Sequence, residues 1–159
     1  MAWSMNSSSG CKDMTNEELI ALAFEAREMA YAPYSNWKVG AALLCKDGRV
    51  IKGCNIENSG FSATVCAERT AFFKAVSEGI CDFEKIAIVG GDAKRGSEGF
   101  CTPCGVCRQV MSEFCRPDEF KVICAKSTEE YHEYTLRQML PECNYIMEQD
   151  DGYGFKAEQ

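Results

Sequence analysis

Residues 66–89 decide the fold, and they read CAERTAFFKAVSEGICDFEKIAIV. The first part predicts a helix from Cys66 to Glu78, because apolar residues recur at helical spacing and Gly79 can end the helix. The second part predicts a short, fully buried strand from Lys85 to Val89, because its residues are almost all apolar. A helix followed closely by a buried strand is typical of domains in which helices cover a sheet.

The sequence on either side extends this alternation. Two strand-like segments, Val39 to Cys45 and Arg49 to Asn55, predict a hairpin around Asp47-Gly48, a dipeptide that tolerates positive φ. The other expected elements are a helix from the Thr15–Glu18 capping box to before Pro33, a helix at Cys104–Phe114, strands at Phe120–Ala125 and Glu130–Tyr134, and a short helix at Leu136–Leu140. Residues 90–103 are expected to form an exposed loop. This order predicts an α/β fold, a three-layer α/β/α sandwich with a mixed five-stranded sheet.

The length and composition bound the domain count and the partners. The 159 residues predict one domain at 13–148, between a disordered leader at 1–12 and a flexible tail at 149–159. No stretch has the apolar length of a membrane span, and the N-terminus lacks the pattern of a signal peptide. A cytoplasmic protein without a membrane partner is therefore expected. The formal charge of −7 argues against a nucleic-acid polymer as partner and favours a small neutral substrate.

The eleven cysteines are expected to be reduced thiols, because their number is odd and no export signal is apparent. Three of them stand at the starts of two expected helices: Cys66 opens one, and Cys104 and Cys107 lie one turn apart in the other. Helix N-termini favour thiolates, and three thiolates leave one position of a tetrahedral Zn²⁺ open for water. Glu68 lies two residues beyond Cys66, close enough to shuttle protons for such a water.

The motifs around these residues resemble those of the homotetrameric cytidine deaminases. The resemblance covers roughly residues 15–141 and rests on five segments: Pro33-Tyr34-Ser35, Val39-Gly40-Ala41-Ala42-Leu43, Asn55-Ile56-Glu57-Asn58, Cys66-Ala67-Glu68-Arg69 and Pro103-Cys104-Gly105-Val106-Cys107-Arg108-Gln109. It implies a homotetramer with one Zn²⁺ per subunit, held by Cys66, Cys104 and Cys107. It also implies that Glu68 is the catalytic acid and base.

The same resemblance implies a substrate and the residues that hold it. The reaction is the hydrolytic deamination of free cytidine and 2'-deoxycytidine to uridine and 2'-deoxyuridine with release of ammonia, a step of pyrimidine salvage. Asn55 and Glu57 would hold the sugar hydroxyl, the backbone at Ala67 would contact the base, and Trp37 would form the aromatic wall of the base pocket. A phosphate near Glu57 would be repelled, which favours nucleosides over nucleotides. Because three thiolates give the zinc site a net negative charge, Arg69 is expected to donate hydrogen bonds to a ligating sulfur.

Departures from the family pattern leave alternatives open. Trp37-Lys38 stands where the family usually has Phe-Pro, and the C-terminal aromatic residue that reaches a neighbouring subunit has three candidates, Tyr145, Tyr153 and Phe155. A sibling deaminase of another aminated nucleoside or analogue is therefore one alternative. A fourth thiolate from Cys101 would close the zinc site and leave a non-catalytic, zinc-stabilised binding module. The cysteine spacing argues against a ferredoxin cluster and a thioredoxin pair, and His132 is expected on the surface.

Overall fold

The computed structural model describes residues 13–140. The expected leader, the expected tail and the three aromatic candidates Tyr145, Tyr153 and Phe155 lie outside the described residues. Within the described range, no helix is long and apolar enough to cross a membrane.

The centre of the fold is a mixed sheet of five strands in the order β2-β1-β3-β4-β5. The strands are β1 (Trp37–Cys45), β2 (Val50–Cys54), β3 (Phe83–Asp92), β4 (Lys121–Ala125) and β5 (Tyr131–Thr135). Strand β1 is antiparallel to β2 and β3, β3 is parallel to β4, and β4 is antiparallel to β5. The predicted mixed five-stranded sheet is confirmed.

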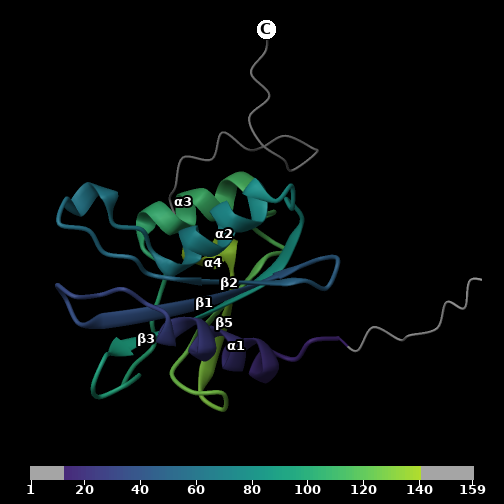
Figure 1. The fold of residues 1–159 in the computed structure, drawn as a ribbon. Coiled ribbons are helices and arrows are strands. Elements are labelled where there is room, and N and C mark those ends of the chain that lie inside the picture. The colour runs from purple at the N-terminus through teal and green to yellow at the C-terminus, as the bar shows by residue number, and fades with distance from the viewer. Residues whose placement is uncertain (1–12, 141–159) are drawn as a thin grey trace, which may run out of the picture.

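Helices cover both faces of this sheet, which confirms the three-layer α/β/α sandwich (Figure 1). Helix α1 (Asn16–Glu28) packs on one face. The other face is covered by α2 (Ala67–Ser77), α3 (Gly105–Phe114) and the short α4 (Leu136–Met139). A single 3-10 turn, η1 (Phe61–Ala63), precedes α2.

The topology brings the starts of two helices to one edge of the sheet. Strands β2 and β3 run in the same direction, because each is antiparallel to β1. Helix α2 follows β2 and α3 follows β3 along the chain. Both helices therefore begin beside the same ends of the strands, which is where ligands bind in most α/β folds.

Strand β3 is longer than the sequence predicts. It was expected from Lys85 to Val89, with residues 90–103 as an exposed loop, but it continues to Asp92, which pairs with Trp37. Two glycines made this end hard to predict, because glycine has a low strand propensity. Here their small size is required, since a Cβ on Gly91 would lie 2.0 Å from the carbonyl oxygen of Gly96.

A buried arginine ties α1 to the region where β1 begins and β3 ends. Arg27 is 6% exposed, and its guanidinium donates hydrogen bonds to the backbone carbonyls of Lys38, Gly91 and Asp92, at 3.2, 3.1 and 2.8 Å. Helix α1 can approach this closely because Gly40 faces it. A Cβ on Gly40 would lie 2.1 Å from a carbonyl oxygen of α1.

Replacement of Arg27 by methionine is expected to lower the free energy of unfolding by about 3 kcal/mol, because carbonyl groups at this junction lose a charged donor. Methionine keeps most of the apolar stem, so the loss reports mainly on the hydrogen bonds. Urea denaturation followed by circular dichroism measures it. Arg49→Met is the control, because the Arg49–Asp47 ion pair is exposed and should add little. Equal losses in both variants would contradict the role assigned to Arg27.

Candidate active site

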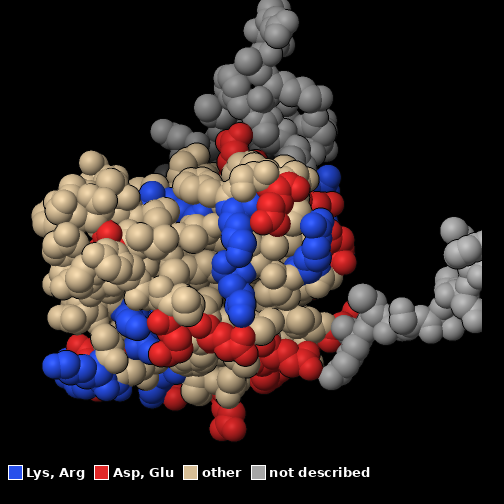
Figure 2. All heavy atoms as spheres, in the orientation of Figure 1, with Lys and Arg blue, Asp and Glu red and all other residues tan. Residues whose placement is uncertain are grey.

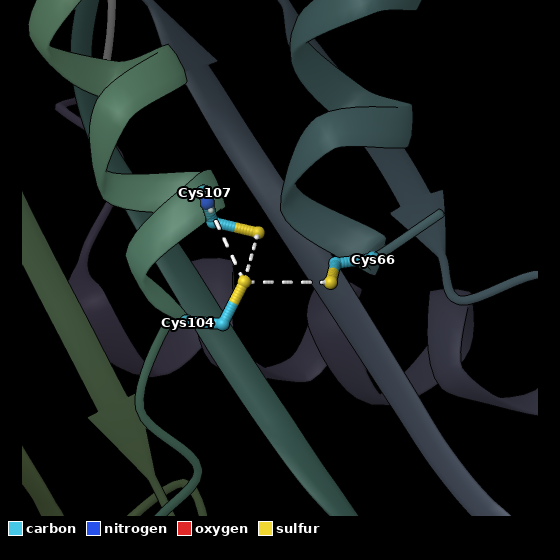
Figure 3. Close-up of side chains that lie close together, drawn as sticks. All are labelled: Cys66, Cys104 and Cys107. Carbon is cyan, nitrogen blue, oxygen red and sulfur yellow. Dashed lines mark hydrogen bonds between the residues drawn. The ribbon is translucent and has the colours of Figure 1, made fainter. Parts of the chain in front are cut away.

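Three cysteine sulfurs converge where α2 and α3 begin (Figure 3). The Sγ atom of Cys104 lies 3.8 Å from that of Cys66 and 3.5 Å from that of Cys107. All three sulfurs lie within 4.8 Å of one another. A tetrahedral Zn²⁺ with Zn–S bonds of about 2.3 Å requires sulfurs about 3.8 Å apart. The spacing and the donor chemistry of this cluster therefore fit zinc.

Two helix starts hold the thiols in place. Cys66 is the N-cap residue of α2, and Cys104 is the N-cap residue of α3. The Sγ atom of Cys104 accepts a hydrogen bond from the backbone N–H of Cys107 at 3.5 Å, so the turn that presents both thiols is also capped by one of them. The partial positive charge of both helix N-termini favours thiolates at this point.

The contact between Cys66 and Cys107 shifts the pKa values of these two thiols in opposite directions. Hydrogen bonding with the Cys107 thiol, assisted by Arg69, lowers the pKa of Cys66 to about 5. The same contact, together with burial, raises the pKa of Cys107. These contacts favour the thiolate form of Cys66, and the thiolate is the form of cysteine that binds metal ions.

Arg69 supplies positive charge beside the sulfurs. Its Nη2 atom lies 3.4 Å from Cys66 Sγ and donates to the carbonyl oxygen of Thr64 at 3.2 Å. Its Nε atom is buried and has no hydrogen-bond partner among the residues described. The guanidinium thus offsets the negative charge that a three-thiolate site accumulates.

Glu68 is a buried carboxyl group in the first turn of α2. It is 4% exposed, and in the described part of the chain only Arg27 is also a buried charged residue. Burial raises the pKa of Glu68 to about 7, and the nearby charge of Cys66 acts in the same direction. Hydrogen bonding with the Cys107 thiol acts against this shift, which places the carboxyl group next to the cluster. A carboxyl group of this pKa can both accept and donate protons near neutral pH.

Cys101 does not join the cluster. The three sulfurs named above form the only group of possible metal ligands found within residues 13–140, and Cys101 is not a member. Its side chain lies against Gly90 of β3, where a Cβ would be 2.7 Å from Cys101 Sγ. Burial also raises the pKa of the Cys101 thiol. This arrangement does not favour the closed four-thiolate site.

The residues expected at the sugar form a separate hydrogen-bonded group. Glu57 accepts hydrogen bonds from the backbone N–H groups of Tyr34 and Ser35, at 2.8 and 3.2 Å, and from the Ser35 hydroxyl. The Ser35 hydroxyl lowers the pKa of the Glu57 carboxyl. The side chain of Asn55 donates to the carbonyl oxygen of Trp37 and accepts from the backbone N–H of Val39, both at 2.8 Å.

Two further expected contact residues have distinct surroundings. Ala67 is the first residue of α2, and its carbonyl oxygen faces Gly53, where a Cβ would lie 2.3 Å away. Trp37 is 47% exposed, and its indole Nε1 would be 3.3 Å from a Cβ on Gly90. Trp37 and Cys101 therefore both lie beside Gly90, near the end of β3 that leads toward α3.

An open pocket of about 430 Å³ lies beside Glu57 and is lined by Tyr34, Ser35, Glu57, Asn58, Phe61 and Thr64. Thr64 connects this pocket to the cysteine cluster, because its carbonyl oxygen accepts from Arg69, which also contacts Cys66. The region around η1, at the left in Figure 1, is almost entirely uncharged on the face that Figure 2 shows. The surroundings suit a neutral, polar ligand better than a charged one.

Ser35 lies within one of the motifs, but sequence reasoning did not predict its contact with Glu57. The position of Ser35 in a short turn was the only sequence signal for a role of this residue. The contact itself could not be predicted, because Ser35 and Glu57 are 22 positions apart along the chain. His132 is exposed on the edge strand β5, where its ring lies 4.2 Å from that of Phe100. It is not part of the metal-ligand group found in the described residues.

Comparisons with known proteins agree with this site. The family model described as the cytidine and deoxycytidylate deaminase zinc-binding region matches residues 13–124. A cytidine deaminase of Sporosarcina psychrophila is 49% identical over 128 residues, covering 80% of this chain and 90% of that protein. A cytidine deaminase of Halalkalibacterium halodurans is 51% identical over 128 residues, covering 80% of this chain and 92% of that protein. The crystal structure of a cytidine deaminase from Burkholderia pseudomallei is 43% identical and superposes with a TM-score of 0.75, covering 82% of this chain and all of that one.

Proposed function

The chain belongs to the zinc-dependent cytidine and deoxycytidylate deaminase family, and we propose that it converts free cytidine and 2'-deoxycytidine to uridine and 2'-deoxyuridine. The observation that carries this proposal is the juxtaposition of three cysteine sulfurs, at two helix N-termini, with the buried carboxyl group of Glu68. A structural zinc site has no need of such a carboxyl group, whereas a hydrolytic one does.

Cys66, Cys104 and Cys107 would hold the Zn²⁺, with one position of the tetrahedron left for water. Bound zinc supplies Lewis acidity, which lowers the pKa of a water molecule from 15.7 to about 7. The chain's own contribution is to keep three sulfurs in place and to balance their charge. Arg69 and the N-termini of α2 and α3 do this by placing positive charge at the cluster.

Glu68 would move the protons of the reaction. Its carboxylate takes a proton from the attacking water, and the water oxygen forms a bond to C4 of the cytosine ring. Glu68 would deliver this proton to ring N3, then take the second proton from the new hydroxyl group at C4 and pass it to the amino group, so that the C4–N bond breaks and ammonia departs. The remaining carbonyl at C4 makes the base uracil. One carboxyl group can serve each transfer because its pKa of about 7 lies close to the working pH.

Asn55, Glu57, Ala67 and Trp37 would position the nucleoside. The open pocket at Glu57 accommodates a sugar, and the Glu57 carboxylate can accept a hydrogen bond from a sugar hydroxyl. A phosphate attached to the same sugar would approach this negative charge without a compensating cation among the pocket residues. The proposal therefore favours nucleosides over nucleotides.

A homotetramer and a cytoplasmic location complete the proposal. Two aromatic residues that line the open pocket are strongly exposed in the single chain, Phe61 at 85% and Tyr34 at 56%, as expected for a surface that a second copy covers. The reducing cytoplasm keeps thiols free to bind zinc. Light scattering after size exclusion tests the assembly, and a mass near one chain, 17.7 kDa, would contradict it.

Ammonia release from cytidine, 2'-deoxycytidine and 2'-deoxycytidine monophosphate tests the proposed reaction. We expect comparable turnover of the two nucleosides and at least a hundredfold lower kcat/KM for the monophosphate, because uncompensated charge repulsion of about 3 kcal/mol corresponds to this factor. Preference for the monophosphate, or release of ammonia only from another aminated base, would overturn the assignment to free cytidine nucleosides.

A further inference from the structure

We propose that Ser35 is a positioning residue that holds the Glu57 carboxylate in the orientation required to accept a hydrogen bond from the sugar. This inference rests on the proposed function and deepens it, since it explains how a partly exposed carboxylate is held in one orientation toward the sugar.

The hydroxyl group of Ser35 can point in only one useful direction. It donates its hydrogen to Oε1 of Glu57 and accepts a hydrogen bond from the backbone N–H of Trp37 at 3.0 Å. A serine hydroxyl has a single hydrogen, so the donor at Trp37 leaves that hydrogen directed at Glu57. The orientation of the hydroxyl is therefore set by the backbone at the start of β1.

The backbone around Ser35 is itself fixed. Ser35 lies in a turn that contains Asn36, the only non-glycine residue with positive φ (57°) between residues 13 and 140. The backbone N–H of Asn36 donates a hydrogen bond to the carbonyl oxygen of Ala32 at 3.1 Å, and its carbonyl oxygen accepts one from the backbone N–H of Ala93 at 2.8 Å. The carbonyl oxygen of Trp37 accepts from the Asn55 side chain at 2.8 Å. These bonds hold the turn that carries Ser35 beside the segment that carries Glu57.

The hydrogen bonds of Glu57 leave room for one more donor. A carboxylate offers about four lone-pair sites. Oε2 of Glu57 accepts from the backbone N–H groups of Tyr34 and Ser35, and Oε1 accepts from the Ser35 hydroxyl. One site, on Oε1, remains for a substrate hydroxyl. The hydroxyl of Ser35 is the only protein donor on that oxygen within the described chain, so it decides where the free lone pair points.

Two substrates separate this role from a general effect on folding. Cytidine has sugar hydroxyls that Glu57 can bind, whereas 2',3'-dideoxycytidine lacks both ring hydroxyls of the sugar. For Ser35→Ala we expect kcat/KM for cytidine to fall about tenfold, mainly through KM, because one charge-assisted hydrogen bond becomes poorly oriented. For the dideoxynucleoside we expect little change, so the ratio of the two kcat/KM values should fall about tenfold. A variant that is merely less well folded would lose activity toward both substrates and keep the ratio.

Matched variants and a binding measurement complete the experiment. Ser35→Thr keeps a hydroxyl and should restore the ratio, and Ser77→Ala, an exposed serine at the far end of α2, should leave it unchanged. In a Glu57→Ala background, Ser35→Ala should cost nothing further for cytidine, since the two residues act through one contact. Uridine binding by calorimetry gives the same comparison without turnover, with an expected tenfold rise in Kd for Ser35→Ala.

The outcomes separate this inference from the proposed function. If the wild type deaminates cytidine and Ser35→Ala keeps the wild-type ratio, the inference is wrong and the proposed function stands. If the wild type binds uridine but does not deaminate cytidine, the proposed function fails, and the Kd of Ser35→Ala decides the inference. If the wild type does neither, both are wrong.

Discussion

Glu68→Gln is expected to lower kcat for cytidine by about 10⁴-fold while the protein keeps its zinc. General acid–base catalysis contributes about 10²- to 10⁴-fold. The upper end applies here because one carboxyl group is assigned the proton transfers of both halves of the reaction. Glutamine has the same shape and can still donate a hydrogen bond, but it cannot take a proton from water at neutral pH.

The burial of Glu68 makes this loss specific. The carboxyl group is 4% exposed, so bulk water cannot readily replace it as a proton acceptor. Its sulfur neighbours Cys66 and Cys107, which are proposed to bind the metal, are unchanged in the variant. Zinc content should therefore stay at one per chain, and uridine should still bind.

Steady-state ammonia release, together with zinc quantification by mass spectrometry, measures both properties. Glu78→Gln is the matched control, because Glu78 is an exposed residue at the opposite end of α2. The control should keep wild-type kcat. Turnover by Glu68→Gln within tenfold of the wild type would exclude Glu68 as the proton shuttle, and loss of zinc in this variant would assign it a structural role instead.

The cysteine cluster could be predicted from sequence because its geometry is local. Cys104 and Cys107 lie on one turn of a helix, and a helix N-terminus at Cys66 follows from the apolar spacing after it. Only the proximity of the two helix N-termini could not be predicted from local sequence and depends on the overall topology. That proximity follows once β2 and β3 run in the same direction, which the order of the hairpin and the later strands already indicates.

The environment of the sugar-side residues could not be predicted in the same way. Glu57 and Ser35 are far apart in the sequence. The turn that carries Ser35 contains Asn36 with a positive φ, and no glycine at this position signals such a conformation in the sequence. The extension of β3 to Asp92 and the hydrogen bonds of Arg27 could not be predicted for the same reason. Each depends on close approach of distant backbone segments, which local propensity does not encode.

Loss of one sulfur from the cluster should remove both the metal and the activity. We expect Cys107→Ala to be purified with less than a tenth of the zinc of the wild type and with no measurable turnover. Only two sulfurs would remain, and two ligands do not make a stable tetrahedral site. The removed thiol is fully buried and lies 3.5 Å from Cys104 Sγ, so its loss takes away one of only three sulfurs of the cluster.

Cys101→Ala is the control that separates an open zinc site from a closed one. Cys101 precedes α3 in the chain, but its thiol packs against Gly90 and is not a member of the cluster of three sulfurs. We therefore expect this variant to keep one zinc per chain and at least half of the wild-type kcat. If Cys101→Ala lost zinc as Cys107→Ala does, Cys101 would be a fourth ligand, no position would remain for water, and the hydrolytic role of the cluster would be wrong. A chain that retains zinc without Cys101 leaves the fourth position to the water that Glu68 needs.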